Sequence, residues 1–208
     1  MEVIIDGERN FRFQGEPADV MAALRAINDF LHAGGRAMLS LKVDGREVRP
    51  DGMVEDLSSI PVDEVSTLEI SSESTAILAE ECLQELRQSA GELSSLCHDL
   101  AAVFHSESPE DGFAPFHQLA DIWATIKTRQ VMVVNALGLN LEEILIEGAS
   151  LAQIHADLNE YLKEAVQALE NGDCILLGDL LEYELAPRAE QEPGIVACLE
   201  GHIPAKPS

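Results

Sequence analysis

The sequence predicts an α+β protein, in which a small module of strands and one helix precedes an antiparallel bundle of about four helices. Two patterns predict this class. In the first third of the chain, apolar and polar residues alternate over several short runs, as in half-buried strands. After Ser74 the apolar residues recur at alternating spacings of three and four, the period of a helix that packs along one face. We therefore expect the module over 1–72, the bundle over 73–192 and a flexible tail over 193–208.

The module should open with a hairpin of two strands. Val3 and Ile5 stand at alternate positions, as do Phe11 and Phe13, and the Asp6-Gly7 pair between them suits a tight turn. An amphipathic helix should follow, because apolar residues recur at helical spacing until the Gly34-Gly35 pair.

Three more strands are expected after this helix, over 39–43, 46–49 and 65–71, with a short helical turn over 53–61. In this order of elements the segment resembles a β-grasp, or ubiquitin-like, module, and the residues that carry the resemblance are Val43-Asp44-Gly45-Arg46-Glu47-Val48 and Leu68-Glu69-Ile70. The resemblance implies a binding or docking surface. It does not imply modifier activity, which needs a free C-terminal Gly-Gly, or a cysteine-bound cluster, because Gly34-Gly35 is internal and the module has no cysteine.

Four helices are predicted for the bundle. Three carry long apolar seams over 76–104, 116–137 and 151–168, and a fourth should begin after Asp173, which is placed to cap it, and end at Pro187. Short connections make such helices antiparallel neighbours. The seams predict a packed core within the chain. They also fit an oligomer in which a second subunit covers one of them, so we expect a homodimer or a complex with another protein.

The net charge of the chain limits the classes of partner that we expect. There are 38 acidic and 13 basic residues, a formal net charge of −25, of which residues 73–208 carry −18. Such a charge repels nucleic-acid phosphates and anionic lipid headgroups, so neither nucleic acid nor a membrane is expected as a partner. The start lacks a secretory signal pattern, and the four cysteines are far apart, which favours a reducing, cytoplasmic compartment.

Motifs for chemistry are few. No histidine has a glutamate three residues before it, which disfavours a di-iron carboxylate site, and no phosphate-binding glycine loop is present. A looser metal site remains conceivable, because His98 and His105 lie seven residues apart on one helical face, with His117 from the next helix and Asp99 or Asp121 as an oxygen ligand. The other interpretation is ordinary surface or partly buried histidines. We expect no cofactor.

Five residues are candidates for interaction rather than chemistry. Asp179, Glu182 and Tyr183 fall within one helical turn and form an acidic and aromatic surface, or simply the solvent side of the last helix. Gln130 is a polar member of an apolar seam, which fixes register in some helical assemblies or lies at the water-exposed margin in others, and Trp123 is the only tryptophan.

Two functions remain open. The first is a non-enzymatic interaction protein, an adaptor, scaffold or chaperone-like protein that acts through its helical seams. The alternative is a metal-binding or enzymatic helical bundle that uses the histidines and acids named above. The long seams, the acidic charge of residues 73–208 and the scarcity of catalytic motifs favour the first.

Overall fold

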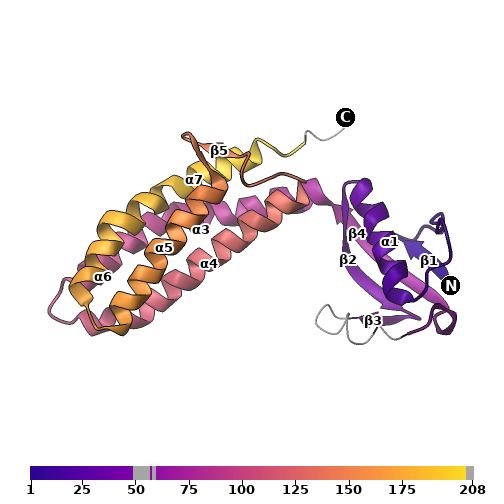
Figure 1. Ribbon diagram of the computed structural model, residues 1–208, viewed down its shortest axis with the longest axis horizontal. Helices are drawn as coiled ribbons and strands as arrows, with labels where there is room; N and C mark the ends of the chain where they lie inside the picture. The colour runs from indigo at the N-terminus through magenta and orange to yellow at the C-terminus, as the bar shows by residue number, and fades with distance from the viewer. Residues whose placement is uncertain (49–56, 58–59, 205–208) are drawn as a thin grey trace. The chain divides into compact units, whose positions relative to one another are not determined.

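The chain folds into two compact units, Met1–Leu78 and Ala79–Ser208, each with a hydrophobic core of its own. This is a computed structural model, and it describes residues 1–48, 57 and 60–204 (Figure 1). The α+β class predicted from the sequence is confirmed. The division between the units falls after Leu78, whereas the change of period had placed it after residue 72. Within the described residues, no helix is both long and apolar enough to cross a membrane.

In the N-terminal unit, helix α1 packs on a mixed four-stranded sheet (Figure 1). Its sheet order is β1-β4-β2-β3, with β1 parallel to β4 and β2 antiparallel to both of its neighbours. The side chain of Asp19 caps the helix by accepting a hydrogen bond from Ala22 N at 2.7 Å. The elements are β1 Glu2–Ile5, α1 Val20–Ala33, β2 Arg36–Val43, β3 Arg46–Val48, a 3₁₀ turn at Val62–Glu64 and β4 Thr67–Ser74.

The hairpin predicted at the start of the chain does not form. Beyond the turn at Asp6-Gly7, only one bridge connects Ile5 with Glu8, and Phe11 and Phe13 lie outside any strand. Their rings pack together instead, with centroids 4.9 Å apart, and Phe11 lies 5.2 Å from Phe30 on α1. These rings therefore pack against α1 instead of belonging to a strand. The alternation of residues in the sequence could not distinguish the two arrangements. The helical turn expected over 53–61 lies mostly outside the described residues.

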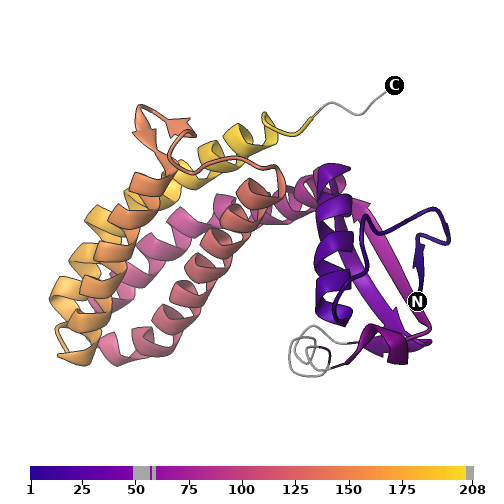
Figure 2. The same cartoon turned by 45° about the vertical axis from the view of Figure 1, so that its right-hand side comes forward.

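The second unit is an antiparallel helical bundle, as predicted (Figures 1 and 2). The cap predicted at Asp173 is present, because its carboxylate accepts a hydrogen bond from Leu176 N at 3.0 Å. Its elements are α3 Thr75–Phe104, a 3₁₀ turn at Pro109–Gly112, α4 Phe113–Ala136, the short strands β5 Leu145–Ile146 and β6 Ala149–Ser150, α5 Leu151–Glu170, α6 Cys174–Leu180, a π-helical turn at Leu181–Leu185, and α7 Ala186–Glu200.

The predicted seams form the core of this bundle. Trp123, Leu83 and Leu93 are completely buried, and the seam residues of α3, α4 and α5 belong to one continuous cluster. Cys97 lies in the same cluster, where burial raises the pKa of its thiol to about 12. The seams are therefore filled by residues of the same chain.

Helix α7 includes residues 193–200 of the segment for which we predicted a flexible tail, so that prediction was wrong for these residues. The helix continues past Pro187 and contains Pro193. A proline inside a helix costs about 3 kcal/mol. Ile195, Val196 and Leu199 are at most 1% exposed, and burying each stabilises by about 1.5–3 kcal/mol, which outweighs that cost.

Candidate functional site

An apolar groove opens between α3 and α4. Its volume is about 220 Å³, and its walls are Leu96, Asp99, Leu100 and Val103 from α3 with Pro115, Gln118, Leu119 and Ile122 from α4. Leu100 and Leu119 belong to the bundle core and form its floor, whereas Leu96 is 40% exposed. Leu96 precedes the buried Cys97 by one residue, so its side chain lies about 100° away from the seam. The groove thus adds an apolar strip beside a core that is already complete.

The segment that carries the groove has carboxylates but no lysine or arginine to balance them. Between Arg87 and Lys127 the chain has six acidic residues and neither lysine nor arginine. Asp99 stands in the wall of the groove itself, and Glu92, seven residues earlier on α3, lies on the same helical face. An apolar strip bordered by carboxylates is the result.

A second polar feature lies inside the bundle, around Gln130. Its amide nitrogen donates to Glu192 Oε2 at 2.7 Å, and its amide oxygen accepts from His155 Nε2 at 2.9 Å and from Lys127 Nζ at 3.3 Å. Lys127 also forms an ion pair with the other oxygen of Glu192 and lies over the Trp123 ring, 5.4 Å from its centroid. We call Lys127, Gln130, His155 and Glu192 the buried polar cluster.

The cluster fastens α4 to α5 and α7. Gln130 is fully buried and Glu192 is 1% exposed. Of the two positions that the sequence left open for Gln130, the water-exposed margin is therefore wrong. Burial lowers the pKa of Lys127, although Glu192 opposes this shift. Burial, and secondarily the charge of Lys127, lowers the pKa of His155 to about 4, which keeps its ring neutral at pH 7. A closed set of mutually paired groups like this one specifies which helices meet.

Four other candidate residues, His105, Asp179, Glu182 and Tyr183, lie together near the C-terminal end of α3. His105 Nε2 lies 3.3 Å from Asp179 Oδ1, and His105 Nδ1 lies 3.9 Å from Glu182 Oε2. The ring packs over Gly178, where an added Cβ would stand 2.4 Å from His105 Nε2. Tyr183 is 64% exposed beside Glu182, whose charge raises the pKa of the phenol. His105, which the sequence suggested as a metal ligand, thus lies against the predicted acidic and aromatic surface of Asp179, Glu182 and Tyr183.

The proposed metal ligands are not assembled into a site. His98, His117 and Asp121 are exposed, and His105 pairs with α6 and the π-helical turn that follows it. In the part of the chain that the structure describes, no group of three or more histidine, cysteine, aspartate or glutamate residues could hold a metal ion.

Comparison with known protein families gives a match that lies in the helical bundle. A family model described as a domain of unknown function (DUF8042) matches residues 81–191, which is more than half of the chain. The chain belongs to this family. The searches of curated proteins and of solved structures found no match. The DUF8042 segment contains both walls of the groove and three members of the buried polar cluster, while Glu192 follows directly after it.

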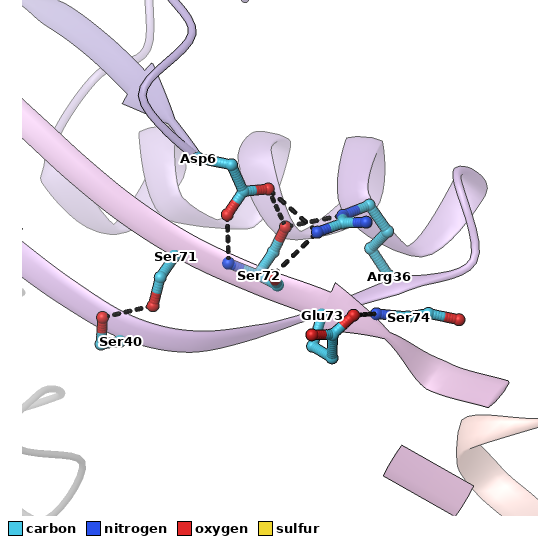
Figure 3. A network of polar contacts seen from close by, with 7 residues as sticks. All are labelled: Asp6, Arg36, Ser40, Ser71, Ser72, Glu73 and Ser74. Carbon is cyan, nitrogen blue, oxygen red and sulfur yellow. Dashed lines mark hydrogen bonds and ion pairs between the residues drawn. The ribbon is translucent and has the colours of Figure 1, made fainter. Parts of the chain in front are cut away.

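A polar network outside the DUF8042 segment was missed in the sequence (Figure 3). The Asp6 carboxylate accepts hydrogen bonds from Ser72 N at 2.7 Å and Ser72 Oγ at 2.6 Å, and it forms an ion pair with Arg36 at 3.1 Å. Arg36 also donates to Ser72 Oγ and to Ser72 O, both at 2.8 Å. The bonds from Ser72 chiefly lower the pKa of Asp6. Asp6-Gly7 indicated only a turn, yet Asp6 fastens the end of β1 to β2 and β4.

Proposed function

We propose that this protein is a non-enzymatic interaction protein, of adaptor, scaffold or chaperone-like type, whose acidic bundle holds a segment of another protein. The observation that carries the proposal is the groove between α3 and α4, an exposed apolar surface on a bundle whose own seams are filled. An apolar surface in water is stabilised when a partner covers it. We place the contact at the groove, because the seam residues are already buried.

The size and lining of the groove support protein binding more than chemistry. Pockets that hold small molecules and cofactors usually measure about 300–1,000 Å³. This groove has about 220 Å³, and its walls contain two polar side chains, Asp99 and Gln118. Neither is a nucleophile paired with a base, the arrangement that covalent catalysis requires. The groove suits a few apolar side chains of a macromolecular partner.

The proposal is tested by site-specific photo-crosslinking in cells that naturally contain the protein. A photoreactive amino acid replaces Leu96 in the groove, and a matched variant carries it at Met132, which is 61% exposed on α4 and does not line the groove. We expect one protein to be joined at position 96 and not at position 132. The partner is identified by mass spectrometry, purified and mixed with the unmodified chain, and light scattering should show a complex of defined mass.

Two results would contradict the proposal. Equal crosslinking at both positions would mean that the groove has no special role. A crosslinked protein that forms no complex when both components are pure would be a chance neighbour. Metal analysis of the same preparation tests the alternative function, since a bound metal that raises the melting temperature would favour a metal-binding bundle.

A further inference from the structure

We infer that the segment held in the groove is a basic amphipathic helix, which lays its apolar face between α3 and α4 and directs lysine and arginine toward the surrounding carboxylates. This inference rests on the proposed function and names the class of partner. It is argued from the length of the groove and from its charge.

The length of the groove matches two turns of a helix. On α3 the apolar wall runs from Leu96 through Leu100 to Val103, which at 1.5 Å per residue is about 10 Å. A partner helix that packs alongside presents its own residues i, i+3 or i+4, and i+7 over the same distance. Ile122 and Leu119 form the opposite wall, so the apolar side chains of such a helix enter between two rows of similar spacing.

The charge of the groove selects the sign of the partner. Residues 88–126 contain six carboxylates and no lysine or arginine, and Asp99 lies in the wall. A second copy of this chain would bring a net charge of −25, and a lipid surface or nucleic acid would be anionic as well. A cationic segment is attracted instead, and its apolar side chains cover the strip that water now contacts.

The test uses a labelled synthetic peptide of about 18 residues with leucine at helical spacing and lysine elsewhere. Two control peptides accompany it, one with the same composition in an order that gives no apolar face, and one with glutamate in place of lysine. Binding to the full-length protein is measured by fluorescence anisotropy at about 150 mM salt, where weak long-range attraction is screened. Methyl NMR of the protein locates the contact.

Two pairs of variants separate the apolar and charged parts of the contact. Leu96→Asn should weaken binding about tenfold through the loss of apolar burial, and Met132→Asn, at an exposed apolar position away from the groove, should leave it unchanged. Asp99→Asn should weaken binding about two- to fivefold, and Glu164→Gln, an exposed acid on α5, should have no such effect. Circular dichroism confirms that each variant is folded.

The expected result is that the basic helix binds, that both control peptides bind at least about tenfold more weakly, and that the methyl shifts gather at Leu96, Val103 and Ile122. Equal binding of the reordered peptide, or equal effects of Leu96→Asn and Met132→Asn, would overturn the inference, because the attraction would then be charge alone. A partner crosslinked at position 96 that is neutral or extended would overturn the inference while the proposed function stands. If the peptide does not bind and position 96 crosslinks to nothing, both fail.

Discussion

His155 donates its Nε2 hydrogen to Gln130 within the buried polar cluster, and this contact makes the stability of the bundle dependent on pH. Its pKa is about 4 in the folded protein, against an ordinary value of 6.5. Between these values the unfolded chain binds a proton that the folded chain does not, so stability falls as the pH drops from 6.5 to 4 and the contribution levels off below.

We predict that His155→Gln, which keeps a donor to Gln130, removes this part of the pH dependence. Relative to the variant, the native protein should lose about 1–2 kcal/mol between pH 6.5 and pH 4, a figure reduced because the ring is only partly buried. Urea unfolding of both proteins at three pH values provides the measurement, and the variant controls for the many surface carboxylates that titrate in both. Parallel curves would show that His155 does not titrate in this range.

Gly178 and His105 form a second residue pair whose energies are coupled. Alanine is favoured over glycine inside a helix by about 1 kcal/mol, but a Cβ at position 178 would stand 2.4 Å from His105 Nε2. We predict that Gly178→Ala stabilises the protein by about 1 kcal/mol when His105 is alanine, and that the gain is lost or reversed when His105 is present. Urea unfolding of the four proteins decides it, and an equal gain in both backgrounds would show that the imidazole simply moves aside.

At the scale of single elements, α7 is held by an ion pair that the rest of the bundle surrounds. Lys127 and Glu192 have 13% and 1% of their side chains exposed. We predict that Lys127→Met destabilises by about 3–5 kcal/mol, because it leaves a buried carboxylate without its cation. Adding Glu192→Gln should restore at least half of that loss, since the amide still accepts from Gln130 and carries no charge.

Thermal and urea unfolding measure both changes, and Lys163→Met serves as the control because Lys163 pairs with Glu160 in solvent, with 67% and 73% of the side chains exposed. Exposed pairs of this kind contribute about 0–1 kcal/mol. Similar losses for Lys127→Met and Lys163→Met would mean that the buried cluster does not hold α7.

The elements differ in how far local sequence reveals them. The three long helices could be predicted because each repeats one spacing over many turns, and Asp173 caps its helix where the sequence placed it. Helix α7 could not, because Pro187, Pro193 and Gly194 oppose a helix locally and only burial in the bundle compensates. The same holds for the candidate site. Gln130 was recognisable as a polar residue within a seam, but its partner Glu192 lay beyond Pro187, where the last helix was predicted to end.

At the scale of the whole molecule, contacts between residues far apart in the sequence determine features that composition and local patterns do not predict. Asp6 and Ser72 are separated by most of the first unit, yet together with Arg36 they connect three strands. The groove likewise forms only because α3 and α4 pack at a particular rotation about their axes. Leu96 could be recognised in the sequence as an apolar residue beside a seam, but the groove could not be predicted without knowing that α4 packs next to it. The net charge of −25, by contrast, follows directly from the sequence, and it predicts repulsion of anionic partners.

The two separate cores make a prediction about the chain as a whole. The cluster around Val20, Ile27 and Leu68 and the cluster around Trp123 share no residue. We therefore predict that a fragment beginning at Thr75, where α3 starts, folds without the first unit and retains the groove. Its thermal transition should coincide with one of two transitions of the full chain, and it should bind the basic helical peptide within about threefold of the full-length affinity.

Circular dichroism, calorimetry and the anisotropy assay on the fragment supply the measurements, and Leu96→Asn in the fragment is the control for specific binding. A fragment that is unfolded, or a full chain with a single transition far above that of the fragment, would mean that the two units stabilise each other. A folded fragment that no longer binds the peptide would instead assign part of the contact to the first unit. The groove belongs to the bundle alone only if the fragment is both folded and competent to bind.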